Sequence, residues 1–156
     1  MEVRFLVQGS APEPYQISVS LSPLMISCTC PAGMNNTICK HRRAILAGEE
    51  TGIVDGDRKR LREIARAAEG AGWPALDAEL GEAKARLLAA EKGYDLTARA
   101  LRDAHYRIAE GDLKTERLEE KARDKMGAAL ETATRVYLEY QRIEAKAKRI
   151  LVAGSY

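Results

Sequence analysis

The sequence predicts an α+β protein, with a small metal-stabilised module of strands and a short helix at residues 1–50, then a helical region at 57–156. Three observations carry this prediction. Apolar residues alternate with polar ones before residue 30, and a cluster of metal-ligand side chains lies within residues 28–41. From Asp57 onward Ala, Glu, Lys, Arg and Leu dominate, and Pro74 is the one proline. The helical region therefore forms a bundle or a coiled-coil-like arm.

Short strands are expected in the first part of the chain. Apolar and polar residues alternate over Val3–Val7 and again over Tyr15–Leu21, which is typical of half-buried strands. Gly9–Pro14 is rich in turn residues, and Pro23 precedes a third strand candidate at Leu24–Cys30. Three short strands bury little apolar surface, so the module needs another source of cohesion.

A C-x-C-x8-C-x-H pattern uses all three cysteines of the chain and one of its two histidines, at Cys28, Cys30, Cys39 and His41. Three thiolates and one imidazole complete a tetrahedral shell for one Zn²⁺ and leave no position for substrate, which is typical of a structural site. Buried cysteines without a metal, or a disulfide, are the alternatives. A disulfide would leave one cysteine unpaired. His105 lies in a helical run without a nearby cysteine, and we expect it at the surface.

Pro31–Thr37 reads as a loop around the metal, and a short helix is expected from Cys39 to its end at Gly48. A β-hairpin that leads into C-x-C, followed by C-x-H at the start of an apolar helix, resembles the SWIM-type zinc finger over residues 3–48. Pro31 after the second ligand also matches. The resemblance implies binding to DNA or to protein, not catalysis. SWIM domains occur in chromatin-remodelling ATPases, Mu-type transposases, ubiquitin-ligating kinases and recombination mediators, whose catalytic segments this chain does not contain.

Residues 49–60 are predicted to be a linker, followed by four helices. Asp57 caps the first, which runs to Glu69, and Trp73–Pro74 opens the second, which ends near Gly93. Asp95 caps the third. The second and third can also form one helix, because a glycine costs only about 1 kcal/mol inside a helix. Gly111–Asp112 is predicted to end the third helix, and the last helix then spans residues 113–152.

The last helix carries an apolar seam with alternating steps of three and four residues, which is a heptad pattern. The seam comprises Met126, Ala129, Ala133, Val136, Tyr140, Ile143, Ala147 and Ile150. Leu130, Tyr137 and Leu151 widen the stripe, which suits a multi-helix bundle better than a two-stranded coil. The bundle closes within one chain or with another subunit. We therefore predict self-association, with a dimer favoured.

The charge pattern is nearly balanced, with a net charge of +2, so the chain is not a polycation. Basic residues near the C-x-H ligands and across the predicted linker form a candidate phosphate-contacting surface with weak sequence specificity. They are Lys40, Arg42, Arg43, Arg58, Lys59 and Arg60. Acidic neighbours dilute this charge, and aromatic residues for stacking bases are scarce.

These patterns predict a non-enzymatic zinc-finger adaptor that binds protein partners and itself. The alternative is a DNA-binding zinc-finger protein that acts in recombination, repair, transposition or mobile-element biology. We expect no enzyme and no small-molecule substrate, because the sequence has no Gly-rich phosphate loop, no Ser/His/Asp set and no open metal site. We expect no signal peptide and no membrane partner, and reduced thiols used as metal ligands indicate the cytoplasm.

Overall fold

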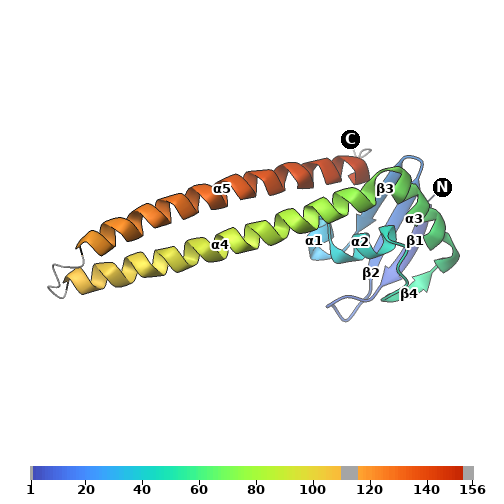
Figure 1. The fold of residues 1–156 in the computed structure, drawn as a ribbon. Helices are drawn as coiled ribbons and strands as arrows, with labels where there is room; N and C mark the ends of the chain where they lie inside the picture. Colours follow the sequence, from blue (N-terminus) through green and yellow to red (C-terminus); the bar gives the residue numbers. More distant parts are fainter. Residues whose placement is uncertain (1, 110–115, 153–156) are drawn as a thin grey trace. The chain divides into compact units, whose positions relative to one another are not determined.

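The computed structural model describes residues 2–109 and 116–152 and has an α+β fold, as predicted (Figure 1). The chain divides into two compact units. The first comprises Met1–Glu79 together with Ile143–Tyr156, and the second comprises Leu80–Arg142. The first unit thus contains not only the strands but also the start of one long helix and the end of another. The division expected from the sequence lay between residues 50 and 57.

A four-stranded antiparallel sheet forms the base of the first unit, with strand order β3-β2-β1-β4. The predicted strands are confirmed as β1 (Glu2–Val7), β2 (Tyr15–Leu21) and β3 (Leu24–Cys28). Phe5 lies opposite Ile17, which in turn lies opposite Cys28. Because side chains alternate across a strand, this register places the buried apolar residues of all three strands on one face.

The range 49–60 is not only a linker, since it contains β4 (Ile53–Gly56) and a 3-10 turn η1 (Arg58–Arg60). β4 pairs with the edge of β1, and Ile53 is buried opposite Val7. The remaining residues of β4 are exposed, so the strand has no apolar alternation that a sequence pattern could detect. Asp57 caps η1 by accepting a hydrogen bond from the Lys59 N–H, and the expected helix begins later.

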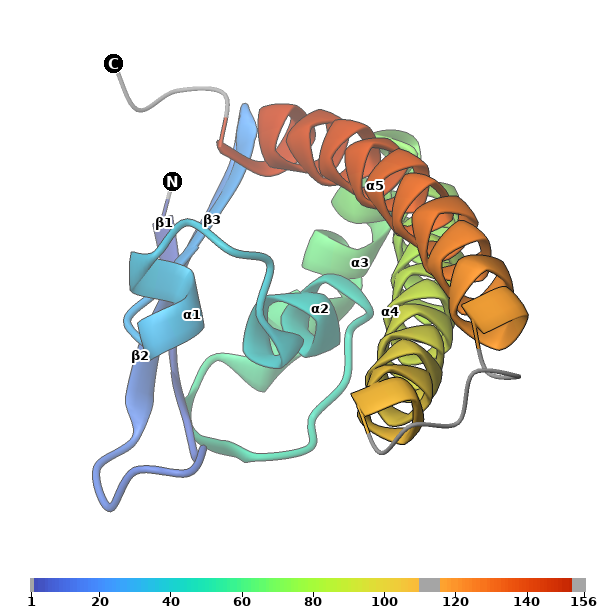
Figure 2. The same cartoon turned by 90° about the vertical axis from the view of Figure 1, so that its left-hand side faces the viewer.

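Three short helices lie wholly within the first unit: α1 (Pro31–Met34), α2 (Lys40–Leu46) and α3 (Leu61–Gly70). α2 packs against both α3 and β3, and α3 contacts β2 (Figure 2). Ile45, Leu46, Leu61 and Ile64 are fully buried where these elements meet. The short helix α1 interrupts the predicted loop, and it contacts β3.

The two long helices are α4 (Trp73–Ala109) and α5 (Glu116–Val152). α4 is continuous through Gly93, so an end near Gly93 and a cap at Asp95 are wrong, and the single-helix alternative holds. The helix-favouring residues on both sides outweigh the cost of one glycine, which is about 1 kcal/mol. The predicted stop at Gly111–Asp112 lies outside the described residues. No helix in the described ranges is both apolar and long enough to cross a bilayer.

The seam of α5 is partly covered within the chain. In the first unit Ile143, Ala147 and Leu151 are buried, and Lys146 lies 3.7 Å from Glu79 of α4. In the second unit α4 and α5 run antiparallel side by side (Figures 1 and 2), and Arg86 bonds Glu139 at 2.9 Å. The seam residues of this unit are half-buried: Met126, Ala129, Ala133, Val136 and Tyr140.

Candidate metal centre

The three cysteines and His41 form one buried cluster in the first unit. Their ligand atoms all lie within 4.8 Å of one another. A tetrahedral zinc site with Zn–S bonds of about 2.3 Å has edges of about 3.8 Å between its sulfur atoms. The cluster could therefore hold one metal ion with small side-chain adjustments, and the predicted ligand set is brought together.

Two of the ligands occupy the same local position at the start of two different helices. Cys30 caps α1, and its Sγ accepts a hydrogen bond from the Gly33 N–H at 3.3 Å. Cys39 caps α2, and its Sγ accepts from the Arg42 N–H at 3.4 Å. Backbone N–H groups at a helix N-terminus favour a negative charge, and the Arg42 N–H is one of the groups that lower the pKa of Cys39.

Hydrogen bonding between the thiols separates their acidities. The Cys28 thiol donates to Cys39 and lowers the pKa of Cys39 to about 4, against the effect of burial. The same hydrogen bond, together with burial, raises the pKa of Cys28. Without a metal, Cys39 is therefore the more acidic thiol of this pair and Cys28 the less acidic one. A metal ion that binds here displaces the protons that the three thiols still carry.

His41 turns its Nδ1 atom toward the cluster, 3.8 Å from Cys28 Sγ. Its ring lies 5.2 Å from the ring of Tyr15, measured between centroids. Gly9 also approaches it closely, since a Cβ atom at Gly9 would lie 3.0 Å from His41 Nε2 and would collide with Tyr15. This packing fixes the imidazole with Nδ1 as the atom that can ligate a metal.

Arg42 supports the cluster from within the fold, a role that the sequence analysis missed. Only 5% of this residue is exposed. Its guanidinium donates to the carbonyl oxygens of Gly33 at 3.1 Å and Thr37 at 3.4 Å, so it ties the loop between the ligand pairs to α2. Three thiolates and a divalent ion carry a net charge of −1, which a neighbouring guanidinium offsets.

Gly33 is a second supporting residue that the sequence analysis missed. It is buried in α1, and a Cβ atom there would collide with the backbone carbonyl of Cys28. The close approach of α1 to the end of β3 therefore requires glycine at this position. The sequence signal for this role was a glycine two residues after Pro31. The sequence pattern does not show which part of the chain lies close to that glycine.

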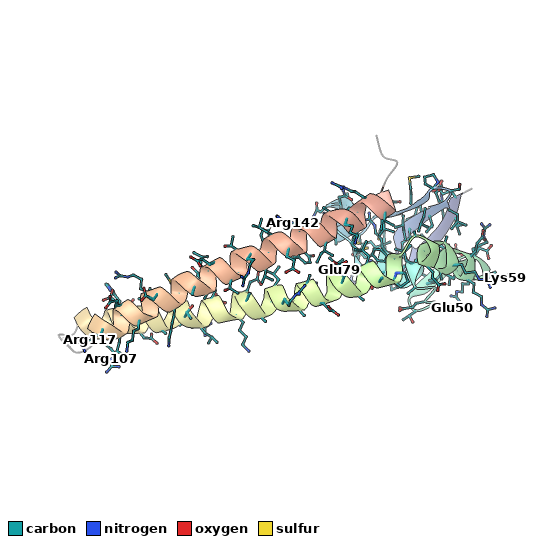
Figure 3. All side chains as sticks on the ribbon, turned by 45° about the horizontal axis from the view of Figure 1, so that its top comes forward. Glu50, Lys59, Glu79, Arg107, Arg117 and Arg142 are labelled. Atoms are coloured by element: carbon teal, nitrogen blue, oxygen red, sulfur yellow. The ribbon has the colours of Figure 1, made fainter. Side chains whose placement is uncertain are left out.

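The six basic residues predicted to contact phosphate occupy different environments. Arg42 is buried, as described above, and Arg43 bonds Asp77 at 2.6 Å. Arg58 donates to the Ile53 carbonyl at 2.7 Å, and Arg60 pairs with Glu63 at 2.5 Å. Lys40, Arg58 and Lys59 are exposed, and Lys59 is labelled in Figure 3. The structure therefore presents part of this set to solvent and uses Arg42 inside the fold.

The arrangement can bind a metal but offers it no open side. All four donor residues are at most 7% exposed, and four ligands fill a tetrahedral shell. The second histidine, His105, is exposed on α4, and its Nδ1 lies 3.7 Å from Glu119. Comparison with protein-family models, curated proteins and solved structures found no match for this chain.

Proposed function

We propose that this protein is a non-enzymatic adaptor, in which a SWIM-type zinc module is joined to helices that bind protein partners and a second copy of the chain. The observation that carries the proposal is the set of large apolar side chains exposed on the helices of the second unit. They are Leu88, Leu96, Tyr106, Leu118, Leu130, Tyr137 and Leu138, each between 47% and 64% exposed. Contiguous exposed apolar surface is typical of protein-interaction sites, and Leu130 and Leu138 of this set line one groove.

Zinc is the metal that the cluster fits best. Three thiolates and an imidazole are soft and borderline ligands, and Zn²⁺ accepts them in a tetrahedral arrangement without a redox reaction. Elemental analysis of protein purified without added metal should find one zinc ion per chain. A folded, metal-free protein would contradict this assignment.

The SWIM assignment rests on the position of the ligands in the fold as well as on their spacing. The C-x-C pair follows a β-hairpin, with Cys28 ending β3, and the C-x-H pair opens α2. The closed donor set argues against metal-based catalysis, because a catalytic zinc ion keeps one position for water or substrate. A binding module is the function that such a site supports.

The adaptor proposal is tested by the mass of the protein in solution. Light scattering over a wide concentration range should give a dimer, because the apolar side chains of the second unit are covered on association. A chain that stays monomeric at the highest concentration would contradict self-association. Binding to other proteins would then be the remaining part of the proposal.

DNA binding is the second candidate, and the exposed Lys40, Arg58 and Lys59 favour it, together with Arg62 and Arg66 on α3. Contacts to phosphates release counterions, so the affinity for duplex DNA should fall steeply with salt. The Lys40→Glu/Lys59→Glu variant should bind more weakly and keep its zinc, because neither residue is a ligand. Failure of the wild type to bind DNA at low salt would remove this candidate.

A further inference from the structure

The outer side of α5 in the second unit carries a short apolar ridge. Leu130, Thr134 and Leu138 recur at every fourth residue, and the two leucines are each 50% exposed. They line a shallow groove together with Glu131, Arg135 and Arg142. Successive residues turn by about 100° around a helix, so the centre of this ridge lies about a third of a turn from the half-buried seam that faces α4, with Leu130 at the boundary between the two. The helix therefore has two apolar sides, and only one is covered within the chain.

One edge of this ridge carries four exposed charges in a polarised order. Asp124 and Glu131 precede Thr134, while Arg135 and Arg142 follow it. Their separations of seven, four and seven residues are close to whole helical turns, so the four lie in one row. Within residues 2–109 and 116–152, none of the four forms an ion pair; Arg142 is labelled in Figure 3.

Some other charges on α5 are paired within the helix. Arg123 bonds Glu119 at 2.9 Å, and Lys148 lies 3.3 Å from Glu144, both one turn apart. The row beside the ridge instead keeps two negative charges toward one end and two positive charges toward the other. If an identical row runs in the opposite direction beside it, the negative charges of each row lie opposite the positive charges of the other.

We infer that a second copy of this chain docks on this ridge, with the two α5 helices antiparallel and a two-fold axis beside Thr134. This inference rests on the self-association proposed above and names the surface that forms it. The axis brings Leu130 of each copy level with Leu138 of the other. It also brings Glu131 opposite Arg135 and Asp124 opposite Arg142. With a rise of about 1.5 Å per residue, each charge pair is within about 3 Å of level, which the arginine side chains can span.

The charges select the orientation, and the leucines supply the buried apolar surface. In a parallel two-fold pair, the two rows would lie on opposite edges of the contact, so Glu131 and Arg135 would have no partner in the other copy. Exposed ion pairs contribute only about 0.2–1 kcal/mol each, so they act mainly by favouring the one arrangement in which they form. A two-fold contact also closes on itself and does not extend into a filament.

The experiment uses two charge-reversed forms of the full chain. Variant one carries Asp124→Arg and Glu131→Arg, so its row is entirely basic. Variant two carries Arg135→Glu and Arg142→Glu, so its row is entirely acidic. Each variant alone should dimerise at least about 10-fold more weakly than the wild type, because four attractive pairs become repulsive. A one-to-one mixture should form a heterodimer with an affinity near that of the wild type, since each basic row then faces an acidic one.

The matched control reverses two charges with the same seven-residue spacing on α4. Lys92→Glu/Arg99→Glu alters exposed residues away from the ridge, and this variant should dimerise like the wild type. Sedimentation equilibrium measures the dimer affinities, and circular dichroism checks that every variant keeps its helices. The substituted residues are exposed, so the fold does not depend on them.

Three results would overturn the inference, and they differ from one another. If both row variants dimerise as tightly as the wild type, self-association uses another surface and the proposed function stands. Weakened variants that do not recover on mixing would exclude the antiparallel arrangement. A wild type that never dimerises would remove both the inference and the self-association on which it rests.

Discussion

The two units of this chain are held together in different ways. In the first unit, side chains distant in sequence are fully buried together, among them Phe5, Ile17, Ile64 and Leu151, beside the Cys₃His cluster. In the described part of the second unit, only Leu80, Ala83 and Ala104 are buried. Its structure is held by the hydrogen bonds within each helix and by the half-buried seam of α5 that faces α4. The first unit therefore depends on long-range contacts and a metal, while the second depends on helix propensity and on what docks against it.

Metal removal should separate the two units most strongly. Structural zinc contributes on the order of 10 kcal/mol to the folding of small modules, so a chelator should abolish the dispersed NMR signals of the first unit. The helical circular dichroism of the second unit should largely remain. Cys39→Ser, which removes a buried ligand, should reproduce the effect. Simultaneous loss of all helical signal would show that the two units do not fold separately.

A matched pair of truncations tests where the core lies. Ile64→Ala removes a fully buried side chain of α3 and should lower the free energy of unfolding by about 2–5 kcal/mol. Leu88→Ala changes a residue that is 58% exposed and should alter it by less than about 0.5 kcal/mol. Denaturant unfolding of both variants provides the measurement. Equal effects would mean that Leu88 is covered in solution.

Substitution of two adjacent arginines tests whether the loop around the metal is stabilised by the buried side chain of Arg42. Arg42→Ala removes the hydrogen bonds to the Gly33 and Thr37 carbonyls and should cost about 1–3 kcal/mol, with faster zinc loss to a chelator. Arg43→Ala removes a partly exposed ion pair with Asp77 and should cost about 1 kcal/mol or less. The zinc-transfer rate and the unfolding midpoint are read together. A faster loss of zinc from the Arg43 variant would reverse the assignment.

Two glycines should respond to substitution in opposite directions. Gly93→Ala should stabilise α4 by about 0.5–1 kcal/mol, since nothing lies within 4 Å of the added Cβ. Gly33→Ala should instead destabilise the first unit, because the added atom meets the Cys28 carbonyl. Thermal unfolding of both variants, followed by circular dichroism, distinguishes them. A stabilised Gly33 variant would mean that α1 can move away from β3 at little cost.

The features that the sequence predicted are local ones. Alternation over Tyr15–Leu21 and the spacing of Cys28 and Cys30 depend only on neighbours along the chain. β4 could not be predicted, because Ile53 is its one buried residue and β1 supplies its pairing partner. The role of Arg42 could not be predicted either, because the sequence does not show whether an arginine next to a metal ligand contacts phosphate at the surface or bonds Gly33 inside the fold. Burial of such a residue is decided by the loop that folds over it.

The first unit combines segments from both ends of the chain, and this determines the order in which its parts can fold during synthesis. Leu151 is completely buried, yet it belongs to the same unit as β1 and is separated from it by the whole of Leu80–Arg142. The ligands at residues 28–41 are close together in the chain and can capture a metal early. The core that includes Leu151 must wait until both long helices have left the ribosome, because contacts between distant residues form late. In the nascent chain, the metal would therefore hold a partly open module until α5 arrives.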